Sequence, residues 1–304
     1  MAVSHMLKKV LPVVLVLAVC LAGPGRAEAQ VRAFVSILPQ KYFVERLAGD
    51  LAEVDVLVLP GANPHMYEPS PRQMTALAKA QVYFAIGVNL EDVWLPKLAD
   101  ANRDLRIVRT QEGVDKIPMA EHHHEGGEQE AMHAGGEHGD GILDPHIWLD
   151  PVRVKTVAAN TCAGLVAVDP AHQAEYEANL AAFVKELDAL NASIVKTLSA
   201  IPADGRTFMV FHPSWGYFAA RYGLTQVPIE AGGNEPSPKH LVEIIEHGRE
   251  RGVNVVFIQP QFSRRSAEVI ASELGARVVP LDPLAEDWKD NLQHAAEAFG
   301  QALR

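Results

Sequence analysis

Three histidines each lie just past a predicted strand or loop, in a short segment that contains proline. His65 lies in GANPHMYEP (61–69), His146 in DPHIWLDP (144–151) and His212 in FHPSWGYF (211–218). Imidazole nitrogens are the commonest protein ligands of late transition metals, and ligands gather at the carboxyl ends of strands in open α/β sheets. A single histidine of this kind is commonly structural. Three of them, in a chain that also has a histidine-rich tract, predict a metal site.

Two further features of the sequence could contribute to metal binding. Asp282 is a carboxylate at the end of the last predicted strand, where on its own it would be interpreted as the N-cap of the next helix. Residues 121–141 contain six acidic residues, six glycines and no Lys or Arg, a composition that cannot build a core and predicts a mobile loop. The histidines of this loop are candidate auxiliary weak metal sites, unless the segment is a solvated linker in which they are incidental: His122, His123, His124, His133 and His138.

The composition is that of a globular protein and excludes several classes of partner and scaffold. The chain has 304 residues, of which 48% are hydrophobic and 21% charged, so a mostly disordered chain is excluded. The formal net charge of -11 argues against nucleic acid or an anionic membrane surface as the main partner. Only two of the residues are cysteines, against 13 histidines. A disulfide scaffold and a cysteine-rich zinc module are therefore both excluded.

The N-terminal segment, residues 1–29, has the pattern of a secretory signal peptide. Two lysines precede an apolar run over residues 10–22, and the sequence Ala-Glu-Ala that ends at Ala29 offers small residues to a signal peptidase. We therefore expect cleavage after Ala29 and export to the periplasm. A retained membrane anchor is disfavoured because the run is shorter than the span of about 20 residues that a bilayer requires. A lipoprotein formed at Cys20 is the other alternative, and the residues before Cys20 match a lipobox only loosely.

The rest of the chain alternates short β-rich runs with longer amphipathic runs, which predicts parallel sheets covered by helices. The expected fold is α/β, with two lobes that are each a mostly parallel sheet flanked by helices, joined by one long backbone helix. The expected boundaries are 30–168 for the N-terminal lobe, 169–202 for the linking helix and 203–304 for the C-terminal lobe. Strands are expected at 31–37, 52–59, 82–86, 106–110, 207–211, 226–229, 253–258 and 277–281, and helices at 39–48, 71–80, 91–101, 214–222, 238–248, 265–274 and 288–303.

The linking helix is predicted from one long apolar stripe. Asp169 followed by Pro170 is a typical helix start, and Pro202 ends the pattern. Between them apolar residues recur at steps of three and four, as one face of a helix requires. We interpret the segment as a rigid strut that packs along both lobes, the alternative being a long surface helix within one domain. The stripe consists of Tyr176, Leu180, Phe183, Leu187, Leu190, Ile194 and Leu198.

Several of these segments together resemble a known family, the metal-specific solute-binding proteins of ABC importers, in the group called ZnuA/TroA-like or cluster A-I. The resemblance runs from about Val31 to the C-terminus and is carried by residues 61–69, 144–151, 211–218, 259–262 and 281–284. It implies two α/β lobes joined by a long helix, with one metal ion between the lobes. Residue by residue, it implies His65 and His146 as ligands from the first lobe, and His212 and Asp282 from the second.

The donor set that the resemblance implies favours zinc. Three neutral imidazoles and one carboxylate suit four-coordinate Zn²⁺, whereas Mn²⁺ prefers more oxygen ligands. Manganese members typically have a carboxylate at the position of His212, and zinc members typically carry an acidic histidine-rich loop. Some zinc members use a water molecule or an acidic residue just before the first histidine, but here Pro64 precedes His65. Asp282 is therefore the expected fourth ligand.

The function implied by the resemblance is capture of Zn²⁺ in the periplasm and its delivery to an ABC importer, without catalysis. The implied partners are an ABC permease in the inner membrane and a periplasmic zinc chaperone, and the chain is expected to be a monomer that binds no nucleic acid. A manganese- or iron-binding homologue is one alternative, and an adhesin or zinc buffer that serves no importer is another. A zinc-dependent hydrolase is also considered, but the sequence contains no H-E-x-x-H motif.

Overall fold

The structure is a computed structural model that describes residues 30–120, 142–230 and 235–303. Val31–Arg304 form one compact unit. The predicted signal peptide and the histidine-rich loop at 121–141 lie outside the described residues. Among the residues that are described, no helix combines the length and the hydrophobicity needed to cross a membrane.

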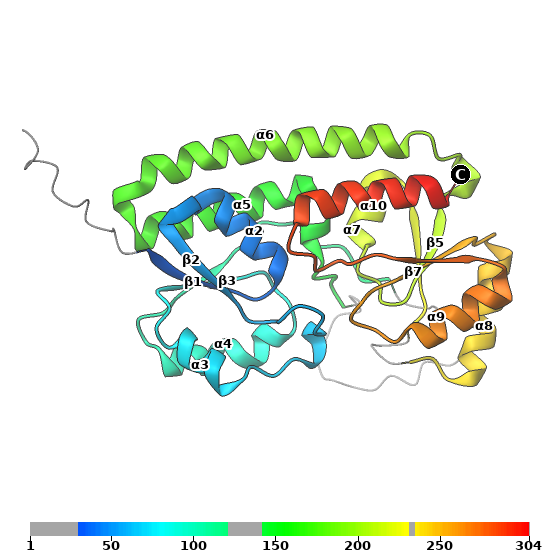
Figure 1. Cartoon of the computed structure of the whole chain (residues 1–304), viewed down its shortest axis with the longest axis horizontal. Helices are drawn as coiled ribbons and strands as arrows, with labels where there is room; N and C mark the ends of the chain where they lie inside the picture. Colours follow the sequence, from blue (N-terminus) through cyan, green and yellow to red (C-terminus); the bar gives the residue numbers. More distant parts are fainter. Residues whose placement is uncertain (1–29, 121–141, 231–234, 304) are drawn as a thin grey trace, which may run out of the picture. The chain divides into compact units, whose positions relative to one another are not determined.

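The first sheet has four parallel strands in the order β2-β1-β3-β4. Its central strands are the most apolar, because both of their faces are covered by helices. In Figure 1, α3 and α4 lie on one side of this sheet, and α2 and α5 on the other. The strands are β1 (Val31–Val35), β2 (Ala52–Val56), β3 (Val82–Ala85) and β4 (Arg106–Arg109), and the helices are α2 (Leu38–Ala48), α3 (Pro71–Leu77), α4 (Leu90–Ala101) and α5 (Pro151–Val168).

The second sheet repeats this topology, with four parallel strands in the order β6-β5-β7-β8. Successive side chains of a strand point to opposite faces. Phe208 and Phe257 accordingly contact Phe299, while Met209 and Val256 belong to a separate apolar cluster on the other face. The strands are β5 (Thr207–Val210), β6 (Thr225–Pro228), β7 (Val255–Ile258) and β8 (Arg277–Pro280), and the helices are α7 (Gly216–Tyr222), α8 (Pro238–Glu250), α9 (Arg264–Leu274) and α10 (Trp288–Ala302).

The two lobes and the long helix confirm the predicted fold. Helix α6 (Gln173–Leu198) has 26 residues, which corresponds to about 39 Å of helix. It packs against α2 and α5 of the first lobe and against α10 of the second (Figure 1). Every residue of the predicted stripe is buried except Leu180, which is half-buried. The helix is shorter than predicted, because residues Pro170–His172 form a 3-10 turn and the α-helix already ends at Leu198.

Helix α5 was not predicted from the sequence. Asp150 caps it by accepting a hydrogen bond from the Val152 N–H (2.9 Å), and Pro151 occupies the first turn. The helix packs against β3, β4 and α6, and its buried residues recur at steps of three and four, as in Val154, Val157, Thr161 and Leu165. A Cβ atom on Gly164 would lie 2.6 Å from the Phe84 ring. The glycine therefore allows α5 to lie directly against the sheet.

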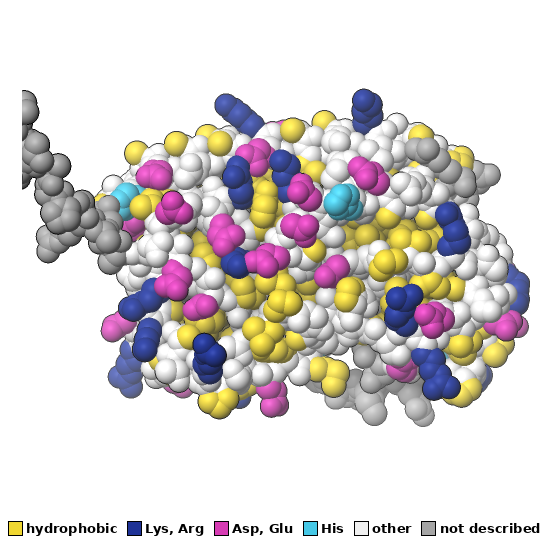
Figure 2. All heavy atoms as spheres, viewed as in Figure 1, with side chains coloured by type: hydrophobic (Ala, Val, Ile, Leu, Met, Phe, Trp, Pro, Cys, Tyr) yellow, Lys and Arg dark blue, Asp and Glu magenta, His cyan; other side chains and the backbone are white. Residues whose placement is uncertain are grey.

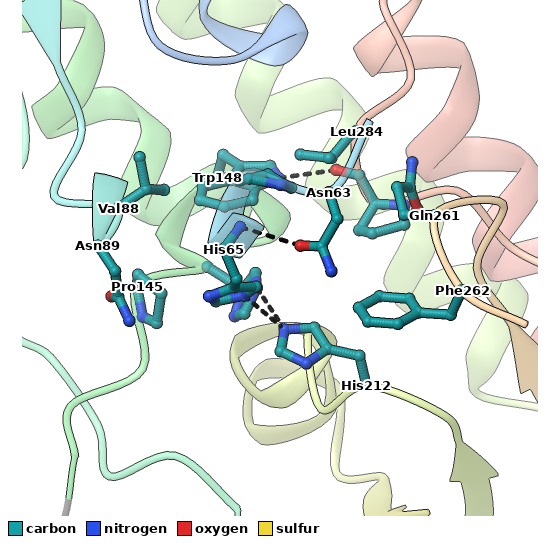
Figure 3. A pocket seen from close by; sticks show the side chains of 13 residues that line it. Asn63, His65, Val88, Asn89, Pro145, Trp148, His212, Gln261, Phe262 and Leu284 are labelled. Carbon is teal, nitrogen blue, oxygen red and sulfur yellow. Dashed lines mark hydrogen bonds between the residues drawn. The ribbon is translucent and has the colours of Figure 1, made fainter. Parts of the chain in front are cut away.

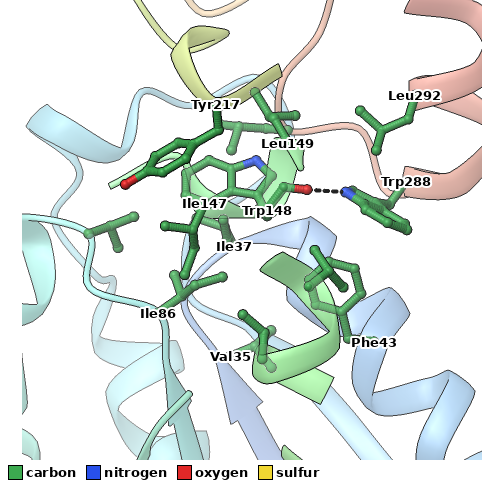
Figure 4. Close-up of a cluster of buried hydrophobic side chains, with 14 of the residues drawn as sticks. Val35, Ile37, Phe43, Ile86, Ile147, Trp148, Leu149, Tyr217, Trp288 and Leu292 are labelled. Carbon is green, nitrogen blue, oxygen red and sulfur yellow. Dashed lines mark hydrogen bonds between the residues drawn. The ribbon is translucent and has the colours of Figure 1, made fainter. Parts of the chain in front are cut away.

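One apolar core extends through both lobes, and tryptophans link its parts. The Trp148 Nε1–H donates to the Pro283 carbonyl and the Trp288 Nε1–H donates to the Trp148 carbonyl, both at 2.8 Å. Figure 4 shows the bond between Trp288 and the Trp148 carbonyl, and Phe43 packs edge-on against Trp288. The segment that carries His146 is therefore bonded to residues of the second lobe as well as to the first.

Surface charges are distributed without a basic patch on the face drawn in Figure 2, where acidic and basic side chains are interspersed. Ion pairs join neighbouring helices, with Arg46 of α2 on Glu186 of α6 and Lys155 of α5 on Asp188 of α6. Such exposed pairs each contribute little to stability.

Candidate metal centre

His65 belongs to a short turn between β2 and α3. The 3-10 turn Pro64–Met66 begins after Asn63, whose side-chain oxygen accepts a hydrogen bond from the His65 N–H (2.9 Å). The residue as a whole is exposed, although its ring lies against two other imidazoles. The His65 turn therefore brings an imidazole to the site from the first lobe while one side of the residue stays in contact with solvent.

His146 is held by a buried aspartate two residues before it. Asp144 Oδ1 accepts hydrogen bonds from the His146 backbone N–H (2.8 Å) and from Nδ1 of its ring (2.7 Å). A carboxylate can only accept, so the proton lies on Nδ1 and the lone pair of Nε2 is available to a metal. Tyr217 of α7 donates to the Asp144 carbonyl (2.7 Å), which fixes this segment against the second lobe.

His212 directly follows the strand predicted at 207–211. The side chains of Gln259 and Glu230 form hydrogen bonds with it. Gln259 accepts from the His212 N–H (3.3 Å) and donates to the His212 carbonyl (2.6 Å), so one amide clamps the backbone. Glu230 Oε1 lies 2.8 Å from His212 Nδ1, and the Phe262 ring stacks on the imidazole with centroids 5.2 Å apart. Nε2 of His212 is again the nitrogen left to face the site.

The three Nε2 atoms lie close together, and Figure 3 shows the rings of His65 and His212 facing each other. His212 Nε2 lies 3.2 Å from His65 Nε2 and 3.3 Å from His146 Nε2, and one ligand atom from each of the three lies within 4.8 Å of the others. A tetrahedral zinc ion with Zn–N bonds of about 2.0–2.1 Å holds neighbouring nitrogens about 3.3 Å apart. Two of the three spacings therefore already match those of a zinc site.

The surroundings of His65 and His212 favour the neutral form of these two rings. Burial, and then repulsion from the rings of His212 and His146, lowers the pKa of His65 to about 3. Burial also lowers the pKa of His212, although the hydrogen bond to Glu230 opposes the shift. A neutral imidazole is the form that binds a metal, so these rings need not lose a proton at neutral pH.

Asp282 is not brought into this group. Its Oδ1 accepts hydrogen bonds from Gln261 Nε2 (2.8 Å) and from the Leu284 N–H (2.9 Å). Gln261 lines the pocket beside the histidines, whereas Asp282 is not one of the residues that line it. The structure thus places three of the four expected ligands together, and the fourth is next to the pocket but bonded elsewhere. The other walls of the pocket are mostly apolar and include Val88, Pro145, Trp148, Phe262, Pro283 and Leu284.

Comparison with known families identifies the chain. The model described as "ZnuA: Zinc-uptake complex component A periplasmic" matches residues 34–302. The chain belongs to the ZnuA family. This match confirms the resemblance to metal-specific solute-binding proteins of ABC importers that the sequence motifs predicted.

Individual proteins are similar to this chain over most of its length. The zinc-binding lipoprotein AdcA of Streptococcus pneumoniae serotype 4 is 30% identical over 88% of this chain, which spans 52%, about half, of the length of AdcA. The iron-binding protein YfeA of Yersinia pestis is 30% identical over 77% of this chain and 70% of YfeA. A crystal structure of ZnuA has 41% identity and a TM-score of 0.81, and the match covers 91% of this chain and all of that one. A ZnuA deletion mutant with zinc bound matches with a TM-score of 0.80 at the same identity, over 90% of this chain and 98% of that one.

Two residues of the site in this ZnuA-family chain were missed in the sequence. Asp144 lies two positions before His146, and a carboxylate so close to a candidate ligand is a signal that could have been used. Glu230 lies 18 residues from His212, after β6, and nothing local in the sequence links the two. The adjacent pairing of β5 and β6 brings them together.

Proposed function

We propose that this chain captures Zn²⁺ between its two lobes and delivers it to an ABC importer, without turning it over chemically. The observation that carries the proposal is the spacing of the three Nε2 atoms, since 3.2 and 3.3 Å are the separations of nitrogens around tetrahedral zinc. Membership of the ZnuA family supports the same function.

The proposed ligands are His65, His146, His212 and Asp282. The first three need only small adjustments to surround an ion. Asp282 must turn toward the pocket, and its hydrogen bonds from Gln261 and Leu284 both fall on Oδ1. The site then has four protein ligands, which is typical of a closed zinc site and leaves no position for a reactive water molecule. A binding role rather than a hydrolytic one follows from this donor set.

The cellular setting is proposed from the sequence pattern and the family. The chain is exported with cleavage after Ala29 and works in the periplasm as a monomer. Its proposed partners are an inner-membrane ABC permease and a periplasmic zinc chaperone that donates the metal. Lipid attachment at Cys20 is the less favoured route, although the pneumococcal relative AdcA is named a lipoprotein. The histidine-rich loop, residues 121–141, supplies weak auxiliary sites that gather zinc.

An iron-binding function is the second candidate, because YfeA is named an iron-binding protein and is 30% identical to this chain. Three imidazoles with one carboxylate favour zinc over iron or manganese, which take more oxygen ligands and higher coordination numbers. Metal competition on the purified chain separates the two functions.

The test is metal analysis and competition titration on residues 30–304, with His65→Ala, His146→Ala, His212→Ala and Asp282→Ala. A structural zinc site of four ligands contributes roughly 10–16 kcal/mol, so the loss of one ligand costs about 3 kcal/mol, or about 100-fold in affinity. His294→Ala is the matched control, because His294 is exposed on α10. Tighter binding of iron or manganese than of zinc would overturn the choice of metal. Tight zinc binding in all four variants would overturn the site.

The loop and the importer are tested separately. Deletion of residues 121–141 should leave one tight zinc site and remove the weaker ones. Stimulation of the permease ATPase by the zinc-loaded chain, and not by the zinc-free chain, tests delivery to the importer. A zinc-loaded chain that stimulates no permease of its own cell would favour a buffer or an adhesin.

A further inference from the structure

Two carboxylates lie directly behind the candidate metal ligands, and neither is needed as a ligand itself. Asp144 is fully buried and Glu230 is 7% exposed. Each places one oxygen on the Nδ1 atom of a histidine, at 2.7 Å for Asp144 on His146 and at 2.8 Å for Glu230 on His212. The ring of His65 has no carboxylate partner among the described residues.

The second oxygen of each carboxylate is unpaired. Asp144 Oδ2 and Glu230 Oε2 are buried and have no hydrogen-bond partner within the described part of the chain. Burying a charge that is only partly hydrogen-bonded costs free energy, and the zinc-free protein gains nothing in return. A divalent ion held at the three Nε2 atoms would lie on the far side of each imidazole from these oxygens, and its positive charge would stabilise both carboxylates.

The backbone leaves room for this arrangement. A Cβ atom on Gly216, at the start of α7, would lie 2.5 Å from Asp144 Oδ2, a separation that real structures do not show. Any other residue at this position would displace the carboxylate that holds His146. The absence of a side chain at Gly216 therefore leaves space for the Asp144 carboxylate and is not required by a turn.

We propose that Asp144 and Glu230 are positioning residues that set the zinc affinity of the site. Each fixes the proton of its histidine on Nδ1, aims the Nε2 lone pair at the ion, and supplies one negative charge that stabilises Zn²⁺, in addition to that of Asp282. Asp144 and Glu230 therefore orient His146 and His212 before the metal binds, and His65 supplies the third nitrogen. This inference rests on the proposed function.

The test compares Asp144→Asn and Glu230→Gln with wild type. Both amides can still accept the Nδ1–H bond through their oxygen, so these variants remove charge and leave geometry. We expect zinc affinity to fall by about 10–100-fold in each variant. The unfolding temperature of the zinc-free protein should stay the same or rise, because a buried and incompletely bonded charge has been removed. Glu230→Ala, which removes the bond as well, should bind zinc more weakly than Glu230→Gln.

Matched controls and a second readout separate positioning from folding. Asp55→Asn and Glu53→Gln change the same chemical groups at exposed positions of β2 and should leave zinc affinity unchanged. The visible spectrum of bound Co²⁺ should keep its tetrahedral form in Asp144→Asn and Glu230→Gln. Gly216→Ala displaces Asp144 without any change of charge and should also weaken zinc binding.

Three results would overturn the inference. They are zinc affinities within about threefold of wild type in both amide variants, a loss of zinc-free stability in step with the loss of affinity, and normal zinc binding in Gly216→Ala. If the wild-type chain itself bound no zinc, the proposed function would fail first, before the variants could be compared.

Discussion

Replacement of Asp150 should lower the free energy of unfolding, because this residue links the two lobes. It is fully buried where the His146 segment enters α5. Its carboxylate accepts from the Val152 N–H (2.9 Å), from Arg153 Nη1 (2.9 Å) and from Arg221 Nη2 (2.8 Å) and Nε (3.1 Å). Arg221 belongs to α7 of the second lobe, so one carboxylate caps a helix and joins the two lobes.

The expected cost of Asp150→Ala follows from these contacts. Loss of a helix cap costs about 1 kcal/mol. Breaking a buried ion pair costs roughly 3–5 kcal/mol, and the lower end applies because the side chains of Arg153 and Arg221 are 23% and 32% exposed and can be partly solvated. The free energy of unfolding should therefore fall by about 4 kcal/mol, which lowers the Tm of a chain of this size by about 10 °C. Asp150→Asn keeps the cap acceptor and should cost about 3 kcal/mol.

The assay is urea unfolding of the zinc-free protein, followed by calorimetry. Asp188→Ala is the matched control, because Asp188 also pairs across helices, with Lys155, but its side chain is 60% exposed. The control should change stability by less than about 1 kcal/mol. If Asp150→Ala and Asp188→Ala lowered the free energy of unfolding equally, the prediction would be refuted, because the burial of Asp150 would then not increase the cost of breaking its ion pairs.

Three further outcomes are expected. The stability of the zinc-free protein should be highest above pH 6.5 and fall as the pH drops toward 3. The reason is that the lowered pKa values of His65 and His212 make the folded state bind fewer protons than the unfolded state. A free energy of unfolding in urea that does not change with pH would contradict this. Gly164→Ala should destabilise by about 1–3 kcal/mol despite the better helix propensity of alanine, because its methyl group meets the Phe84 ring, and a stabilised variant in thermal melts would show the contact to be soft. Phe183→Ala, which opens a cavity under α6, should cost about 3–5 kcal/mol by denaturant unfolding, and a cost below about 1 kcal/mol would mean that the helix is not part of the core.

The sequence predicted most of the elements because their patterns are local. All eight strands are found, and most of them end one or two residues earlier than predicted, since the carboxyl-terminal residues turn out into the loops above the sheets. Helix α5 was missed, although Asp150-Pro151 is a good start signal, because alanines also occupy its exposed face and weaken the contrast with the buried one. Helix α6 was found because one of its faces meets solvent, but a 3-10 turn at Pro170–His172 shortens it at its start.

The candidate site was predictable only in part. His65, His146 and His212 stand out by their residue type in short loops, and the structure brings them together. Their partners could not be inferred in the same way. Glu230 reaches His212 because two neighbouring strands pair, and Gln261 engages Asp282 because the ends of β7 and β8 are adjacent. Contacts set by strand order do not appear in a linear pattern.

Helix α6 has a consequence for how an importer could tell a loaded chain from an empty one. A single rod of 26 residues contacts both lobes, so large changes in the distance between the lobes would break its packing along most of its length. The loaded and empty states must then differ in a small area of the surface. The turn that carries the exposed His65 is such an area. A receptor for this chain would have to recognise the local conformation at the rim of the site rather than the distance between the two lobes.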